Sequence, residues 1–222
     1  MGTAQRKERE KELRRSQILT AAEQVILEKG HDQLNMDEVA ERAEVSKGTL
    51  YLYFTSKTDL ILGIVHKASI MLNAKIAEVL TRDLPGIELV HNIAVEYLNF
   101  VHEHPEFYGA MRFYENLRDA KEEYSSEYVD LCETYAQQGF SYTIRAIQIG
   151  MQDGTIDKRY DPKELALLIW ASSKGMVNLA YLQKSSHHLE FLDGMDVQIS
   201  GLFDSFMNFL ENGIASTKKP TD

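Results

Sequence analysis

The sequence has little of what holds small secreted proteins together or places proteins in membranes. One cysteine, Cys132, occurs among 222 residues, so an internal disulfide is excluded and a reducing compartment is expected. The longest wholly apolar run, residues 165–171, is far shorter than the ~18 residues of a membrane span. The first fifteen residues mix basic and acidic side chains without an apolar stretch, unlike a secretion signal. We therefore expect a cytoplasmic protein with no membrane segment.

Proline is also scarce, and the chain shows no sustained alternation of apolar and polar residues. Four prolines leave long uninterrupted segments, and apolar residues recur at three- and four-residue steps, the period of a helix. Gly30, Pro85–Gly86, Pro105 and Pro162 mark helix boundaries. The sequence predicts an all-α fold of about nine helices. We expect them at residues 8–29, 36–43, 47–54, 56–80, 86–103, 105–117, a segment from about 127 to 150–154, 162–184 and 196–212, with a loop at 185–194.

Charge is unevenly distributed along the chain. The sequence holds 24 basic and 34 acidic residues, for a net charge of −10. Residues 1–57 carry ten of each sign, so the whole excess of negative charge falls in the remainder. Within residues 1–15, six basic residues face three acidic ones. A solvated, salt-bridged helix explains this end of the chain, and so does contact with a polyanion.

The two short helices expected at 36–43 and 47–54 are joined by a short turn, as in a helix-turn-helix unit. Such a pair is a common packing element, and DNA binding is one of its uses. One face is apolar and would point inward: Met36, Val39, Ala40, Ala43, Val45, Leu50 and Phe54. At 100° per residue, Gly48 and Leu52 point away from Leu50. No acidic residue occurs from Val45 to Ser56, so this outward face can approach phosphates closely.

The motif in this region is specific. Residues 34–60 read Leu-Asn-Met-Asp-Glu-Val-Ala-Glu-Arg-Ala-Glu-Val-Ser-Lys-Gly-Thr-Leu-Tyr-Leu-Tyr-Phe-Thr-Ser-Lys-Thr-Asp-Leu and closely resemble the TetR family of bacterial transcriptional regulators. The resemblance covers about residues 12–72, with its most specific part at 45–57. One position departs from the family pattern, because Glu44 stands in the turn where glycine is usual.

The resemblance implies a set of DNA contacts. Asn35 and Ser46 would cap helices and approach phosphates, while Tyr51, Tyr53 and Lys57 would hold the DNA backbone. Lys47, Gly48, Thr49 and Leu52 would lie against base edges, with Leu52 suited to touch a thymine methyl group. The basic segment Arg6–Arg15 would either add contacts to DNA or form a solvated tail.

The resemblance also implies an organisation and a function. Residues 1–57 would form an N-terminal arm and a three-helix DNA-binding domain with its motif at 35–54, residues 58–215 a larger ligand-binding and dimerisation domain, and residues 216–222 a loose tail. The expected protein is a ligand-responsive transcriptional regulator, a repressor. It would bind a near-palindromic operator as a homodimer and be released by a small apolar or aromatic effector.

Two further sets of residues are candidates for the effector pocket and the dimer interface, and both can equally be core. Aromatic residues and methionines that suit an apolar pocket are Tyr97, Phe100, Phe107, Met111, Tyr114, Phe140, Trp170 and Met176. A stripe on the last helix that suits a dimer interface consists of Leu202, Phe203, Phe206, Phe209 and Leu210.

The alternative function is an all-helical enzyme or ligand carrier that contains a helix-turn-helix unit. It would need a reactive group of side chains, and the sequence shows no phosphate-binding glycine loop, nucleophile motif or paired metal ligands. His102 and His104 are two residues apart, so on a helix they point in different directions. His187–His188 lacks a third ligand nearby. We expect no metal, no cofactor and no catalytic residue.

Overall fold

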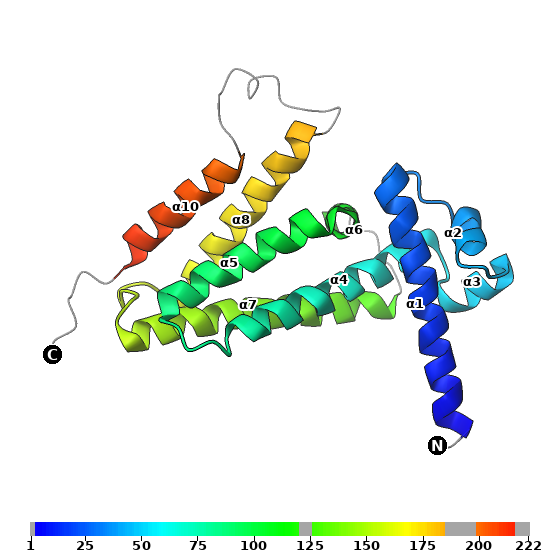
Figure 1. The fold of residues 1–222 in the computed structure, drawn as a ribbon, viewed down its shortest axis with the longest axis horizontal. Coiled ribbons are helices and arrows are strands. Elements are labelled where there is room, and N and C mark those ends of the chain that lie inside the picture. Colours follow the sequence, from blue (N-terminus) through cyan, green and yellow to red (C-terminus); the bar gives the residue numbers. More distant parts are fainter. Residues whose placement is uncertain (1–2, 120–125, 185–198, 216–222) are drawn as a thin grey trace. The chain divides into compact units, whose positions relative to one another are not determined.

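The structure, a computed structural model, describes residues 3–119, 126–184 and 199–215. These residues form nine α-helices and no sheet, which confirms the all-α prediction (Figure 1). The helices are α1 (Thr3–Lys29), α2 (Met36–Arg42), α3 (Lys47–Tyr53), α4 (Lys57–Val79), α5 (Gly86–Glu103), α6 (Pro105–Asp119), α7 (Glu127–Asp153), α8 (Pro162–Lys184) and α10 (Ile199–Ile214).

Most helix boundaries fall within two residues of those expected, and the largest difference is at the N-terminus. Helix α1 begins at Thr3 rather than at residue 8. Its first three turns have no buried residue, so apolar periodicity could not reveal them; they contain i,i+4 pairs such as Arg6–Glu10, at 2.8 Å. The last helix is described from Ile199 onward, and its expected start at residue 196 lies outside the described residues. The loop expected at 185–194, with His187–His188, and the tail at 216–222 lie outside the described residues.

The chain divides into two compact units. The first comprises Met1–Met71 and Val101–Ala136, and the second Leu72–Phe100 and Gln137–Asp222. Helices α4 and α7 each contribute residues to both units. These units describe packing, whereas the predicted boundary between residues 57 and 58 describes function and stays a prediction.

The core of the first unit is built on α1 and α4. Ile18 and Val25 of α1 are fully buried, as are Leu60, Ile61 and Ile64 of α4. Within the described residues, α4 is the one helix long and apolar enough to cross a membrane, but half of that apolar stretch is buried inside the fold. The hydropathy of α4 is therefore that of a core helix.

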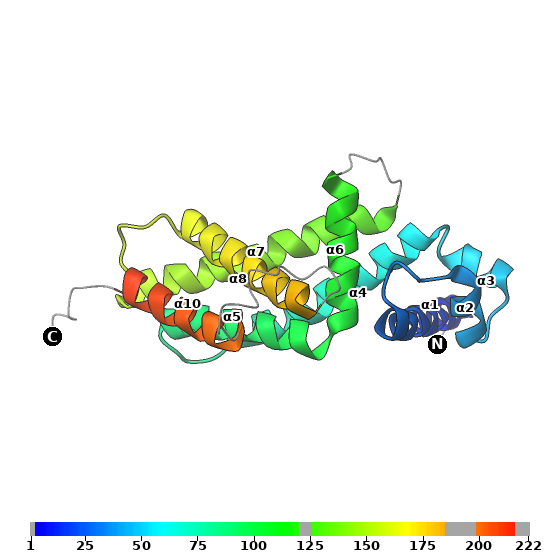
Figure 2. The ribbon, with the colours of Figure 1, turned by 90° about the horizontal axis from the view of Figure 1, so that it is seen from above.

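The second unit packs α5, the C-terminal part of α7, α8 and α10 around one apolar core. Leu89 of α5, Ile147 of α7, Ala166 of α8 and Met207 of α10 belong to it. Helices α8 and α10 lie side by side, as both views show (Figures 1 and 2). The outer surface of this pair is therefore a property of the second unit alone.

Candidate nucleic-acid interface

Two capped helix N-termini organise the helix-turn-helix unit. The Asn35 side chain accepts a hydrogen bond from the Asp37 amide at 2.8 Å, and Ser46 Oγ accepts one from the Thr49 amide at 3.0 Å. Each cap satisfies one of the amides that an α-helix leaves free at its start. The remaining amides, with the positive end of the helix dipole, suit a negatively charged group.

The turn between α2 and α3 contains the departure noted in the sequence. Glu44 adopts a φ of +52°, the only positive φ of a non-glycine residue among those described. The Val45 amide donates to the Ala40 carbonyl at 3.0 Å and closes the turn. The left-handed conformation that glycine usually provides is therefore retained here by glutamate, at a cost of about 1–2 kcal/mol.

The two faces of α3, the proposed recognition helix, differ as the sequence predicted. Leu50 and the following Phe54 are fully buried, whereas Leu52 is 84% exposed. A Cβ added at Gly48 would approach only Ser46 Oγ, at 3.9 Å, so the backbone there is open to a ligand. The outward face of α3 therefore combines an exposed apolar side chain with accessible backbone.

The inward face of the unit follows the prediction with one difference. Met36, Val39, Ala40 and Ala43 are buried with Leu50 and Phe54. Val45 is only partly buried, because it lies in the turn rather than on a helix.

The predicted cationic contacts are held by neighbouring acceptors. Lys47 Nζ lies 2.6 Å from Asp37 Oδ1, and both side chains are exposed. Lys57 Nζ donates to the Asp32 carbonyl at 2.8 Å. The structure brings both lysines to the same unit as the two caps. The hydrogen bond to the Asp37 carboxylate raises the pKa of Lys47, so the amine is fully charged.

The remaining predicted contacts are polar and reachable. Thr49 Oγ1 shares a hydrogen bond with Ser46 Oγ at 2.8 Å. Tyr51 is 42% exposed, and Tyr53 is partly buried. All nine predicted contacts therefore lie within a segment of 23 residues that folds as one unit.

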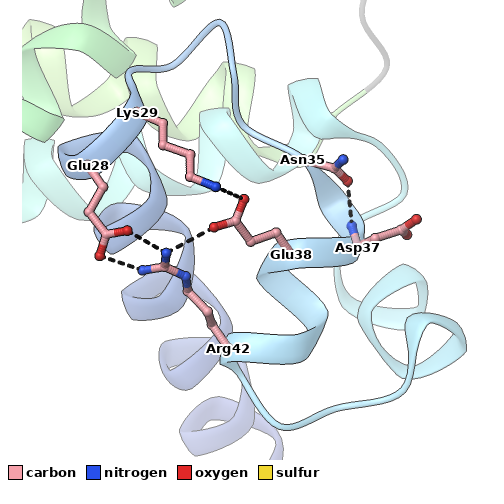
Figure 3. Close-up of polar contacts among 6 residues, drawn as sticks. All are labelled: Glu28, Lys29, Asn35, Asp37, Glu38 and Arg42. Atoms are coloured by element: carbon pink, nitrogen blue, oxygen red, sulfur yellow. Dashed lines mark hydrogen bonds and ion pairs between the residues drawn. The ribbon is translucent and has the colours of Figure 1, made fainter.

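An ion-pair network joins the end of α1 to α2 (Figure 3). Arg42 pairs with both oxygens of Glu28 and with Glu38 at 2.9 Å, and Lys29 reaches Glu38 at 2.8 Å. The Arg42 hydrogen bond lowers the pKa of Glu28, and that from Lys29 lowers the pKa of Glu38. Sequence reasoning missed this network; the i,i+4 spacing of Glu38 and Arg42 was its one visible signal.

The basic N-terminal segment divides into an exposed part and a packed part. Residues 4–14 are exposed along α1, and Lys7, Lys11 and Arg14 follow one stripe at i, i+4 and i+7. Arg15 is different, because it packs over the Tyr128 ring at 5.8 Å and lies 3.6 Å from Glu127. The basic segment is therefore part of helix α1, and its last arginine, Arg15, packs against α7.

The junction between α3 and α4 is tied to the start of α7. Asp59 accepts hydrogen bonds from the Thr55 amide at 2.9 Å and from Ser126 Oγ at 2.7 Å. Phe54 stacks on Tyr128, with ring centroids 6.1 Å apart. The end of α3 therefore packs against α7 through Phe54 and Tyr128, a contact that the sequence alone did not reveal.

The eight residues predicted to line a pocket are divided between the two units. Phe107, Met111 and Tyr114 belong to the first unit, and the others to the second. Phe100 and Phe107 are buried, and Met176 lies in the core of the second unit. Tyr97 is partly buried and Phe140 packs against that core. Trp170 is 53% exposed and lies on the outer surface of α8.

The five residues of α10 that were predicted for the dimer interface differ in their burial. Phe203 and Leu210 point into the core with Met207, at 7%, 8% and 2% exposure. Leu202 and Phe206 are partly buried, and Phe209 is 77% exposed. Leu202 and Phe206 pack against the same core, so Phe209 is the one residue of the five that is exposed.

Comparison with known proteins agrees with this geometry. Residues 18–64 match the sequence profile of bacterial regulatory proteins of the tetR family. An uncharacterized HTH-type transcriptional regulator of Haemophilus influenzae is 28% identical over 106 residues, which cover 48% of this chain and 57% of that protein. The HTH-type transcriptional activator FasR of Mycolicibacterium smegmatis is 44% identical over 54 residues, covering 24% of this chain and 25% of FasR. The matched segments thus span a quarter to about half of these relatives.

Solved structures share the fold over nearly the whole chain. A Rhodococcus protein of unknown function superposes with a TM-score of 0.70 and 18% identity, covering 91% of this chain and 95% of that one. Bacillus subtilis FadR in complex with stearoyl-CoA superposes with a TM-score of 0.66 and 18% identity, covering 90% of this chain and 98% of that one. The relatives found by sequence are HTH-type transcriptional regulators rather than enzymes. Residues 18–64 therefore carry the conserved segment of the tetR family of bacterial regulatory proteins, and the chain as a whole shares the fold of these solved structures.

Proposed function

We propose that this regulator is a repressor that binds a near-palindromic operator as a homodimer and releases it when a small apolar or aromatic effector binds. It would work in the cytoplasm, on the chromosome. The observation that carries the DNA-binding part is the outward face of α3. Leu52 of α3 is 84% exposed, in the same helix-turn-helix unit as the capping residues Asn35 and Ser46.

Each group on this face has a role that its chemistry supports. The caps Asn35 and Ser46 and the charged Lys57 suit phosphates, which position the protein without reading sequence. Gly48 leaves room for a base edge, and Leu52 offers an apolar contact to a thymine methyl group. This division predicts that affinity and sequence preference can be changed separately.

A dimer is supported by exposed apolar residues on the two helices that lie side by side. Trp170, Leu167 and Leu168 of α8 are 53%, 52% and 65% exposed, and Phe209 of α10 is 77% exposed. Exposed apolar side chains that share one side of a helix, as Leu167 and Trp170 do at a spacing of three residues, are typical of a protein–protein interface. We assign it to a second copy of the chain, because one operator with two-fold symmetry needs two recognition helices.

The effector part of the proposal is supported by the core of the second unit. The second unit has a core rich in large apolar side chains, which suits an apolar ligand that inserts among them. The fold is shared with a FadR structure that contains stearoyl-CoA, so long-chain acyl-CoA is a reasonable first probe, beside aromatic compounds.

The proposal is tested by titrating the full chain with DNA from upstream of its own gene, followed by fluorescence anisotropy. Binding at nanomolar concentration to one near-palindromic segment, with weaker binding to scrambled DNA, supports it. Stearoyl-CoA and aromatic compounds are then added to the complex. By linkage, an effector that weakens DNA binding is itself bound more weakly in the presence of operator, by the same factor. Equal effector affinities with and without operator contradict the ligand-responsive part.

A further inference from the structure

We propose that Asp37 limits the DNA affinity of this protein by holding Lys47, the first residue of the recognition helix, in an ion pair that DNA must break. The inference rests on the proposed DNA-binding function. Its structural basis is the 2.6 Å distance between Asp37 Oδ1 and Lys47 Nζ. The pair connects α2 to α3 across the turn, within the surface that carries the proposed contacts.

The position of Asp37 makes it an unusual residue on this surface. It lies directly after the first residue of α2, and its own amide is the group that Asn35 caps at 2.8 Å. Asn35 is expected to approach a phosphate, so the Asp37 carboxylate would lie near the same phosphate. From Val45 to Ser56 the chain has no acidic residue. Asp37 thus adds negative charge to a surface otherwise suited to a polyanion.

The other acidic residues of α2 are arranged differently. Glu38 is engaged by Arg42 and Lys29, which tie it to the end of α1. Glu41 lies one helical turn beyond Asp37 and is exposed. Asp37 is the one whose carboxylate pairs with a predicted DNA contact.

Lys57 offers a comparison within the same surface. Its amine donates to the backbone carbonyl of Asp32, at 2.8 Å. When Lys57 turns to a phosphate, it leaves a neutral carbonyl that water can solvate. When Lys47 turns to the DNA, the Asp37 carboxylate is left as a full negative charge among phosphates. The cost of DNA binding is therefore larger at Lys47, although the pair itself is exposed and weak.

The Asp37 charge should therefore lower the affinity for DNA by a measurable amount. Removing the Asp37 charge frees Lys47 for the DNA and ends the repulsion between Asp37 and nearby phosphates, so both specific and nonspecific duplex should bind more tightly. The loss of an exposed ion pair and of one repulsion together should raise the affinity about two- to tenfold at low salt. The log–log salt slope should steepen by up to about one per subunit, because the net positive charge that faces the DNA rises by one.

The test uses the full chain and its variants Asp37→Asn, Lys47→Met and the double variant, titrated with operator and random duplex between 50 and 200 mM salt. Asparagine keeps the shape of the side chain and removes its charge. Glu41→Gln is the matched control, since it removes the same charge from the same helix away from Lys47. Melting temperatures of all variants check that the fold is retained.

Tighter binding by Asp37→Asn with a steeper salt slope, lost in the Lys47→Met background and absent in Glu41→Gln, supports the inference. Unchanged or weaker binding overturns it. A gain that persists in full without Lys47, or that Glu41→Gln reproduces, also overturns it, because the effect is then one of total charge. If the wild-type chain binds no duplex at any salt concentration, the proposed function fails and this inference with it; if it binds, the variants test Asp37 alone.

Discussion

A Cβ added to Gly86 would lie 1.9 Å from the backbone nitrogen of Gly150, so the start of α5 and the end of α7 touch through bare backbone. Asp153 strengthens this junction by accepting a hydrogen bond from the Gly86 amide at 2.7 Å. Any side chain at residue 86 must force the two helices apart. The contact fixes how α5 and α7 pack in the second unit.

We therefore predict that Gly86→Ala lowers the free energy of unfolding by about 2–4 kcal/mol, since backbone atoms cannot yield as a flexible side chain can. Gly175→Ala in α8 is the control. A Cβ there meets nothing within 4 Å, so alanine should stabilise the helix by up to about 1 kcal/mol. Thermal and urea unfolding measure both. Equal effects of the two substitutions would show that the Gly86–Gly150 contact is not close.

Tyr128 supplies a second prediction, because its ring packs in the core whereas its hydroxyl contributes no hydrogen bond to the described part of the fold. The residue is 3% exposed and its ring stacks on Phe54, while its buried hydroxyl has no hydrogen-bond partner among the described residues. Burial raises the pKa of Tyr128 to about 12, so the phenol stays neutral. Tyr128→Phe should be neutral or stabilise by up to about 1–2 kcal/mol, whereas Tyr128→Ala should cost about 3–5 kcal/mol. A clear loss of stability in Tyr128→Phe would reveal a hydrogen bond from the hydroxyl.

His66 makes stability depend on pH. The centroid of its ring lies 5.5 Å from that of Tyr128 and 5.4 Å from that of Tyr135. Burial, and then the positive charge of Arg15, lower the pKa of His66 below 6.5, and the smaller effect of Glu127 opposes them. The unfolded chain then binds more protons than the folded one between the lowered pKa and 6.5. Stability is full above pH 6.5 and falls as the pH decreases through that window.

The expected loss is below about 1 kcal/mol, because the ring is partly exposed and water screens its charge. Urea unfolding at pH 7.5 and 5.5, for wild type and His66→Gln, measures it. The difference between the two pH values should shrink in the variant. A variant that keeps the whole difference would assign it to other groups.

The first unit was predicted more fully than the second, for a physical reason. Capping residues act locally, so Asn35 and Ser46 could be placed from the sequence. The family pattern left open whether Glu44 keeps a left-handed turn or makes a different one, and the structure shows the left-handed turn. Pairs such as Arg42–Glu28 and Phe54–Tyr128 join distant parts of the chain, and no local rule predicts them.

The outer stripe of α10 shows a different kind of limit. Leu202, Phe203, Phe206, Phe209 and Leu210 were treated as one set, although neighbours in the chain, such as Phe209 and Leu210, point about 100° apart on a helix. Sorting them by period would have distinguished the core residues Phe203 and Leu210 from Phe209. Composition could not place Trp170, because large aromatic residues fill cores and interfaces alike.

At the DNA surface we predict opposite behaviour for two residues. Lys57→Ala should weaken binding to specific and nonspecific duplex about equally and reduce the log–log salt slope by about one per subunit. Leu52→Gln should change which sequences bind, by about 1–3 kcal/mol per base pair, and leave nonspecific affinity nearly unchanged. Binding to a library of operator variants at several salt concentrations measures both. A sequence-selective loss in Lys57→Ala would contradict its phosphate role.

The last prediction concerns the surface shared by α8 and α10. Phe209 is 77% exposed, so replacing it does not disturb the core of the second unit, and Phe209→Glu should leave the melting temperature of the monomer nearly unchanged. If a second copy covers this residue, a buried unpaired carboxylate at the interface costs several kcal/mol and gives monomers. Asn208→Glu adds the same charge at an exposed neighbouring position on another face and should remain dimeric. Sedimentation measures the mass, and anisotropy should show that tight operator binding is lost with the dimer, because one recognition helix alone contacts one half-site. Dimers of unchanged stability in Phe209→Glu would place the interface elsewhere on the chain.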